Sequence, residues 1–157
     1  MAVMIDMSKS RNQDIQYVRL IDLSKCIGCG ACESACEFVH NGITYIKVYR
    51  SDIGIETPLS CLHCDKAPCI DSCPTEALIR DSSGAVIVIP DKCIGCRNCM
   101  IACPFGIPVY NVQLSSVTKC DLCRDLRARG LEPACYAICP TGAIVVNKWE
   151  EILGSKK

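Results

Sequence analysis

The spacing of the cysteines constrains this chain more than any other feature of its sequence. Sixteen of the 157 residues are cysteines, and eight of them lie between Cys61 and Cys103. These eight form two groups of four, and each group ends in a Cys-Pro pair, Cys73-Pro74 and Cys103-Pro104. Repeated C-x-x-C steps bring several thiols into one loop, so each group can surround a compact metal centre.

This central spacing is typical of bacterial ferredoxins with two [4Fe-4S] clusters. Three thiolates in one loop bind one cluster, and the fourth cysteine starts a helical turn and points to the neighbouring cluster. Between the two groups, the apolar segments Thr75–Ile79 and Ala85–Ile89 flank the turn residues Asp81–Gly84, which predicts a β-hairpin. We therefore expect a small two-cluster lobe with a hairpin on one side.

Composition favours clusters over disulfides or zinc. Aromatic residues make up only 5% of the chain, so the clusters must replace much of an ordinary core. Many cysteines also occur in the disulfide scaffolds of short secreted proteins, but residues 1–16 carry charges and show no apolar segment of a signal peptide. Zinc ribbons pair two C-x-x-C knuckles and have no use for a third thiolate two residues later.

Charge and hydropathy bound the expected location and partners. The longest apolar run, around Ala85–Pro90, fits a strand and is far shorter than the ~20 residues of a membrane span. The formal net charge is zero, and no basic run indicates nucleic-acid binding. We expect a soluble, cytoplasmic protein. Four clusters would add a charge of about −8, which a positively charged partner surface would complement.

The central pattern is repeated outside the central stretch. Cys26–Cys36 aligns with Cys93–Cys103 at an offset of 67, and Cys135–Ile144 aligns with Cys69–Leu78 at an offset of 66. The sixteen cysteines therefore form four groups of four. Two pairings are sensible: groups one with two and three with four, or a nested pairing of two with three and one with four.

The flanking segments favour the nested pairing. Group four is followed by Ala143–Val146 and group one is preceded by Tyr17–Asp22, which supply the two strands that the central hairpin also has. Groups one and three are followed by Glu37–His40 and Pro104–Pro108, and neither segment resembles a ferredoxin strand. We predict an α+β fold, a duplicated two-cluster ferredoxin with two nested lobes, short hairpins and short helices. The predicted parts are an N-terminal tail at 1–16, an outer lobe at 17–58 and 109–157, and an inner lobe at 59–108.

The nested pairing assigns every cysteine to a cluster. Cluster 1 is predicted on Cys26, Cys29, Cys32 and Cys139; cluster 2 on Cys36, Cys120, Cys123 and Cys135; cluster 3 on Cys61, Cys64, Cys69 and Cys103; and cluster 4 on Cys73, Cys93, Cys96 and Cys99. No thiol is then left for nucleophilic catalysis, and no dinucleotide or phosphate-binding fingerprint is present. We expect sixteen iron ligands and no catalytic residues.

Several other residues carry predictions. Ile43–Tyr49 alternates like a strand, and Asn147–Leu153 is predicted as a C-terminal helix with Asn147 as its N-cap. His63 is predicted to donate a hydrogen bond toward a cluster or the backbone. Each lysine that precedes a ligand is predicted to be solvated, with raising a nearby cluster potential or contacting a partner as the alternatives: Lys25, Lys92 and Lys119. Four connector residues are predicted to contact a partner or to pack the lobes together: Ile43, Tyr45, Val109 and Tyr110.

The full pattern resembles one family. It is carried by Cys61-x-His63-Cys64, by the segments Cys93–Pro108 and Lys119–Cys123, and by Cys135–Ala143. From about Val18 to Val146 the chain resembles the four-cluster electron-transfer subunits of molybdenum and tungsten pterin oxidoreductases. That family includes the small subunits of dimethyl-sulfoxide-reductase-like enzymes, formate dehydrogenases and some tungsten aldehyde oxidoreductases.

The resemblance implies four [4Fe-4S] clusters in a non-catalytic subunit with the nested ligation. It implies a large catalytic pterin-containing partner that faces cluster 1, and electrons that leave from the inner lobe, to a further redox subunit or a ferredoxin. The short connector between the first two groups, without a C-terminal anchor, is most similar to the compact cytoplasmic members found with tungsten aldehyde oxidoreductases. Two alternatives stay open: a freely diffusing polyferredoxin and an iron–sulfur redox sensor.

Overall fold

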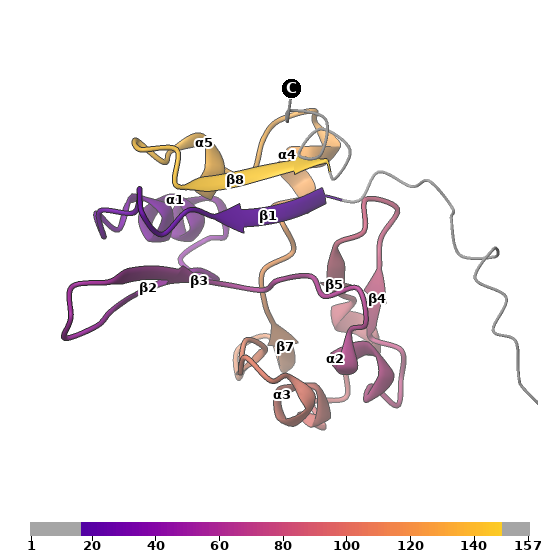
Figure 1. The fold of residues 1–157 in the computed structure, drawn as a ribbon. Coiled ribbons are helices and arrows are strands. Elements are labelled where there is room, and N and C mark those ends of the chain that lie inside the picture. The colour runs from indigo at the N-terminus through magenta and orange to yellow at the C-terminus, as the bar shows by residue number, and fades with distance from the viewer. Residues whose placement is uncertain (1–16, 149–157) are drawn as a thin grey trace, which may run out of the picture.

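The computed structural model describes residues 17–148, which form short helices and four two-stranded antiparallel sheets (Figure 1). The helices are α1 (Ala31–Val39), α2 (Pro68–Asp71), α3 (Asn98–Ala102), α4 (Arg124–Ala128) and α5 (Ala134–Ala137), with a 3₁₀ turn at Pro90–Lys92. The strands are β1 (Tyr17–Ile21), β2 (Lys47–Arg50), β3 (Glu56–Leu59), β4 (Leu78–Arg80), β5 (Val86–Val88), β6 (Val109–Asn111), β7 (Ser116–Thr118) and β8 (Ile144–Lys148). This mixture of short helices and hairpins agrees with the predicted α+β class.

The first and last described strands pair with each other. β1 and β8 run antiparallel, with Tyr17 opposite Lys148 and Ile21 opposite Ile144, and Figure 1 shows the indigo and yellow strands side by side. The equivalent pair in the middle of the chain is β4 with β5, with Leu78 opposite Val88. Both predicted strand pairs are therefore confirmed, although the central hairpin is shorter than the predicted segments.

Helices α1 and α3 contain equivalent cysteines but differ in length, and the residue after the last cysteine of each group explains the difference. α1 continues through Cys36 to Val39, whereas α3 ends at Ala102 and Cys103 is extended, with ψ 115°. Cys103 precedes Pro104, and a residue before proline is disfavoured in the helical region. Cys36 is followed by Glu37, which places no such restriction on it.

The two connectors between the cysteine groups also form hairpins, β2–β3 and β6–β7. β2 begins only at Lys47, so the predicted strand over Ile43–Tyr49 is wrong in its first half. The predicted helix at Asn147 is also wrong at its start, because Asn147 and Lys148 lie in β8. The rest of that segment, to Leu153, lies outside the described residues.

The core consists of two small clusters of buried side chains that share the β5 strand. Ala85 and Ile87 pack in one core with Cys36 and Ile144. Val86 packs in the other core with Cys99. Neighbouring residues of a strand point to opposite faces, so β5 joins the two cores. Among residues 17–148, no helix has the length and apolar character that crossing a membrane requires.

Candidate iron–sulfur sites

Two cavities in the structure are each lined by four cysteines. One is lined by Cys26, Cys29, Cys32 and Cys139. The other is lined by Cys61, Cys64, Cys69 and Cys103. These are the two sets predicted for clusters 1 and 3. Apolar side chains complete both walls, including Val48 and Pro58 in the first and Val86 in the second.

The cysteines predicted for cluster 2 also lie near one another. Burial, together with the negative charges of Cys120 and Cys36, raises the pKa of Cys123 and of Cys135 to about 12. Charges shift the pKa of a thiol strongly only at short range. Cys36 of group one therefore lies close to Cys123 and Cys135 of group four.

The set predicted for cluster 4 shows the same proximity. Burial raises the pKa of Cys99 to about 11, and the charges of Cys73 and Cys96 add to the rise. The charge of Cys73 also acts on Cys93. The members of each of the four predicted sets are thus neighbours in the structure.

The geometry fits clusters better than single ions. Within the described part of the chain, no group of three or more His, Cys, Asp or Glu side chains surrounds a single metal position. Two cavities instead bring four cysteines each to one place, and four thiolates are the ligand number of a [4Fe-4S] cluster. The buried thiols of high pKa also need a strongly positive centre to become thiolates.

The first C-x-x-C loop of each cysteine group has the same backbone feature. The third residue of that loop has a positive φ: Gly28 (64°), His63 (50°), Gly95 (68°) and Leu122 (59°). In two of these loops the same residue donates its N–H to the first cysteine, from His63 to Cys61 Sγ and from Leu122 to Cys120 Sγ, both at 3.4 Å. The tight turns expected at the glycines are present, but sequence reasoning missed the two non-glycine positions. Their place within C-x-x-C was the available signal.

The connector hairpins cover two of these loops. A Cβ on Gly28 would lie 2.6 Å from the Glu56 carboxyl carbon, and one on Gly95 would lie 3.0 Å from the Tyr110 ring. Arg50 donates to the Gly28 carbonyl at 2.7 Å. Glycine is needed at both positions for close approach as well as for φ.

Backbone and hydroxyl donors stabilise particular thiolates. Ala77 N–H donates to Cys73 Sγ at 3.2 Å, and Tyr45 N–H donates to Cys36 Sγ at 3.2 Å. Burial raises the pKa of Cys73, but the backbone N–H groups of Thr75, Leu78 and Ala77 and the Thr75 hydroxyl outweigh it, so the pKa is lowered. The pKa of Cys139 is lowered in the same way, because backbone N–H groups and the Thr141 hydroxyl outweigh the effect of burial. The two Cys-Pro-Thr segments are thus pre-arranged for thiolates.

The His63 imidazole accepts a hydrogen bond from the backbone through Nδ1. Its Nδ1 accepts the Val86 N–H at 3.0 Å, and its Nε2 is buried with no partner among the described residues. Burial, followed by the charges of Lys119 and Arg19, lowers the pKa of His63 to about 3. The predicted backbone contact is therefore confirmed, but its direction is reversed, and the imidazole is neutral.

The three lysines that precede ligands behave differently. Lys25 is 57% exposed and pairs with Asp22 at 3.2 Å, and Lys92 is exposed. Lys119 is buried, so its predicted solvation is wrong. No sequence signal distinguished it, because its burial arises from contacts with residues far away in the chain.

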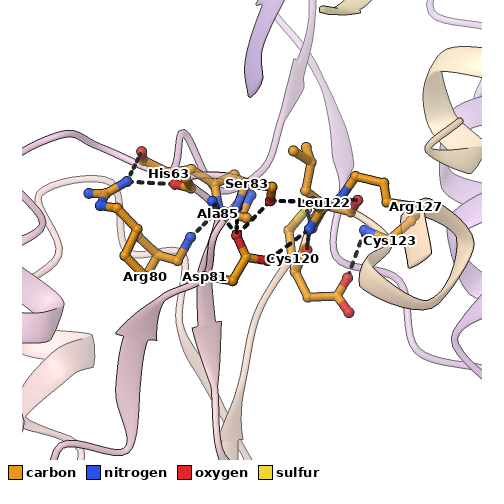
Figure 2. A network of polar contacts seen from close by, with 12 residues as sticks. His63, Arg80, Asp81, Ser83, Ala85, Cys120, Leu122, Cys123 and Arg127 are labelled. Atoms are coloured by element: carbon orange, nitrogen blue, oxygen red, sulfur yellow. Dashed lines mark hydrogen bonds and ion pairs between the residues drawn. The ribbon is translucent and has the colours of Figure 1, made fainter. Parts of the chain in front are cut away.

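A polar network joins the outer and inner ligand groups (Figure 2). Arg127, on α4, pairs with Asp81 Oδ2 at 3.1 Å and donates to Ser83 Oγ in the β4–β5 turn. Burial raises the pKa of Asp81, but hydrogen bonds from Ser83 and Arg127 outweigh it, and the pKa is lowered. Arg80 extends the network to the carbonyl oxygen of Asp65 at 2.8 Å, within the Cys61–Cys69 loop. The turn thereby ties α4 to a ligand loop of the inner lobe.

Comparison with known proteins agrees with this architecture. Residues 54–148 match the family described as "4Fe-4S dicluster domain", and residues 25–77 match a second family profile with the same description. The chain belongs to the 4Fe-4S dicluster family. Its two dicluster matches and sixteen cysteines fit four [4Fe-4S] clusters.

Named members of the dicluster family are similar over most of their length. The thiosulfate reductase electron transfer subunit PhsB of Salmonella typhi is 40% identical over 149 residues, which cover 87% of this chain and 78% of the relative. Protein NrfC of Escherichia coli (strain K12) is 39% identical over 87% of this chain and 67% of its own length. One polypeptide of the anaerobic dimethyl sulfoxide reductase of the same strain is 35% identical, with coverages of 87% and 76%. These relatives confirm the resemblance to electron-transfer subunits of dimethyl-sulfoxide-reductase-like enzymes.

Proposed function

We propose that this chain is a non-catalytic electron-transfer subunit that works bound to a large catalytic pterin-containing oxidoreductase subunit. The observation that carries the proposal is the division of sixteen thiols into four separate sets, two of which line cavities of their own. Bound clusters would supply one-electron transfer, which amino-acid side chains do not supply at the reduction potentials of iron–sulfur clusters. The two relatives named as parts of reductases support a catalytic partner.

We assign the ligands of the four clusters as the nested pairing predicts. Two pieces of evidence support it: Cys139 shares a cavity with Cys26, and β8 pairs with β1. The alternative pairing would have joined group one to group two. The chain's own part is to hold the thiolates, to donate N–H groups to sulfur and to exclude water with apolar walls.

We also propose a small change to the lobe boundaries. Val117 packs in the core that contains Cys69 and Cys99, and its N–H donates to Cys93 Sγ at 3.5 Å. The β6–β7 hairpin therefore belongs with the inner lobe, and we place the boundary after Thr118. The outer lobe then consists of residues 17–58 and 119–148 of the described chain.

For docking, we propose that the catalytic subunit covers the surface next to cluster 1. Cys29 is exposed there, and the neighbouring Ile27 and the β2–β3 turn residue Ile53 are exposed apolar side chains. Of the four connector residues predicted at a partner interface, only Val109 is largely exposed, at 58%. Tyr110 instead packs on Gly95 and under Arg97, with the guanidinium carbon 4.5 Å from the ring centroid. These contacts lie within the inner lobe as redrawn above, so they favour a packing role for Tyr110 inside that lobe rather than at a partner interface.

The partner's chemistry and its compartment complete the proposal. The relatives named as parts of thiosulfate and dimethyl sulfoxide reductases favour a reductase as the partner. We propose that it contains molybdenum, with a tungsten aldehyde oxidoreductase or formate dehydrogenase as the alternative. We propose a cytoplasmic location, because none of the sixteen cysteines forms a disulfide and the proposed clusters need all of them reduced, as reducing compartments keep them. Fractionation of the native host with an antibody tests this, and recovery from the periplasm would contradict it.

Co-purification tests the subunit assignment. Anaerobic purification from the native host at moderate salt should recover a much larger pterin-containing chain, whose metal then decides between molybdenum and tungsten. Cys26→Ser should slow substrate-driven reduction of an external acceptor while the partner's own cofactor remains reducible. If the protein purifies alone and accepts electrons equally well from unrelated reductases, it is a diffusible polyferredoxin.

A further inference from the structure

Two positively charged side chains are buried where the ligand loops of clusters 2 and 3 meet. Lys119, which precedes Cys120, is 5% exposed, and Arg19, on β1, is 8% exposed. The Lys119 ammonium lies 3.6 Å from Cys61 Sγ and donates to the Cys120 carbonyl at 2.9 Å and to the Val86 carbonyl. One charge therefore contacts a ligand of cluster 3 and the backbone of a ligand of cluster 2.

Arg19 spans the same junction from the other side. Its Nη1 donates to the hydroxyl of Ser60, the residue before Cys61, while its Nε and Nη2 are buried without hydrogen-bond partners among the described residues. Burial raises the pKa of Cys120, and the charges of Arg19 and Lys119 oppose that rise. The charge of Cys61 also acts on Cys120, so the two ligand loops are close in space.

Neither cation has a carboxylate partner. The ion pairs between residues 17 and 148 involve other basic side chains, and none includes Lys119 or Arg19. Burying an unpaired charge is unfavourable, so native proteins compensate it. Two clusters with their thiolates, each of charge about −2, supply the missing negative charge at this junction.

We propose that Lys119 and Arg19 form a cationic bridge that raises the reduction potentials of clusters 2 and 3. A fixed positive charge near a cluster stabilises the electron that the cluster gains on reduction. Lys119 acts mainly on cluster 3, whose Cys61 sulfur it contacts. Arg19 acts on both clusters, because it bonds Ser60 beside Cys61 and its charge also acts on Cys120 and Cys135. Both are positioning residues that set the driving force for transfer between the lobes. This inference rests on the proposed ligand sets.

The test is a redox titration of the full-length chain, followed by electron paramagnetic resonance with dithionite as the reductant. Only preparations with the wild-type iron and sulfide content are compared. In Lys119→Met, one of the four midpoint potentials should fall. At the wild-type midpoint potential, the ratio of reduced to oxidised cluster should then be at least tenfold lower than in the wild type, which corresponds to about 59 mV for one electron. Lys119→Arg keeps the charge and should return that ratio to within about threefold of the wild-type ratio.

Two matched controls remove the same charge at the equivalent sequence position. Lys25 and Lys92 also directly precede a ligand, but both are exposed. Lys25→Met and Lys92→Met should change the ratio by less than about twofold, because water and salt screen exposed charges. An equal shift in Lys92→Met and Lys119→Met would overturn the proposal, since it would report net charge rather than the buried bridge.

Unchanged midpoints in Lys119→Met at full iron content would also overturn the bridge. If Lys119→Met loses iron, Lys119→Gln, which keeps a hydrogen-bond donor, and Arg19→Gln decide by the same criterion. Loss of iron from every uncharged variant, with retention in Lys119→Arg, would show that the charge only maintains structure, and would overturn the claim about potentials. A wild-type chain without four clusters would instead refute the proposed function, so the two failures are distinguishable.

Discussion

The outer and inner lobes use the same ligand pattern but are assembled over different distances in the chain. In the inner lobe, β4 and β5 are joined by the short turn at Asp81–Gly84. In the outer lobe, the equivalent pair is β1 and β8, from the two ends of the described chain. The same contacts therefore require a much larger loop to close, and loop closure costs conformational entropy. The comparison shows that ligand pattern and chain connectivity can vary independently.

Truncation should separate the lobes most strongly. A chain that ends after Thr118 lacks Cys120, Cys123, Cys135 and Cys139 and the β8 strand, so it should keep clusters 3 and 4 and lose both others. Anaerobic iron and sulfide analysis should then give about eight irons in place of about sixteen.

The reciprocal fragment is the control for that truncation. Residues 1–74 contain all of group one and group two, and should hold no two stable clusters. Two stable clusters in this fragment, with none in a fragment from Glu56 to Thr118, would establish the alternative pairing of the groups.

In the cluster-free protein, alkaline pH should destabilise the outer lobe more than the inner lobe. Burial raises the pKa of the outer-lobe thiols Cys123 and Cys135 to about 12, whereas in the inner lobe it raises the pKa of Cys99 only to about 11. One cysteine of the outer lobe, Cys139, and two of the inner lobe, Cys73 and Cys93, have lowered pKa values. A buried thiol with a raised pKa stabilises the fold while it is protonated. That stability is lost as the pH rises from about 9, where unfolded thiols ionise, toward 12.

Hydrogen exchange of the cluster-free protein measures this difference. As the pH rises above about 9, amides of β1 and β8 should lose protection before those of β4 and β5, compared with the intrinsic exchange rate at each pH. Equal loss in both sheets would mean that the burial of Cys123 and Cys135 does not distinguish the lobes.

The junction between the lobes offers a smaller perturbation. Arg127→Met removes the largely buried pair with Asp81 and leaves a carboxylate without its partner, at a cost of about 3 kcal/mol. We expect cluster loss in urea at lower concentration, with the outer lobe affected first because α4 lies between its ligands. Arg129→Met, on an exposed residue of the same segment, is the control and should change the midpoint little.

The smallest effects should come from the glycines. Gly28→Ala introduces a Cβ at φ 64° and 2.6 Å from the Glu56 carboxyl carbon, which should cost about 2 kcal/mol in the free energy of unfolding. Gly142→Ala has φ 63° with open space around it, and should cost only the backbone part, about 1 kcal/mol. Urea unfolding of the cluster-loaded protein measures the free energy of unfolding of both variants.

Removing the Glu56 side chain refines that measurement. Adding Glu56→Ala to Gly28→Ala should bring the cost down to that of Gly142→Ala, measured against Glu56→Ala alone. If Gly28→Ala costs as much without the Glu56 side chain as with it, the hairpin contact is unimportant and the positive φ accounts for the whole cost.

Features set by local spacing were predictable from the sequence, and features set by distant contacts were not. The β1–β8 pair followed from the repeat, because Ile144 follows Cys139 at the spacing at which Leu78 follows Cys73. The burial of Lys119 depends on Cys61 and Val86, which no local pattern connects to it. The predicted start of β2 was wrong for a related reason, because the Tyr45 N–H donates to Cys36 Sγ instead of to a neighbouring strand.

The pairing of β1 with β8 also has a consequence for synthesis on the ribosome. With the proposed ligand sets, the inner clusters could form once Cys103 has been made, whereas cluster 1 would have to wait for Cys139. The first thiols to be made, on Cys26, Cys29 and Cys32, are thus among the last to be completed as a site. Throughout most of translation they are three reduced sulfurs without a fourth, exposed to oxygen and to stray metals. A nascent chain of this design therefore needs a protected environment longest at its oldest end.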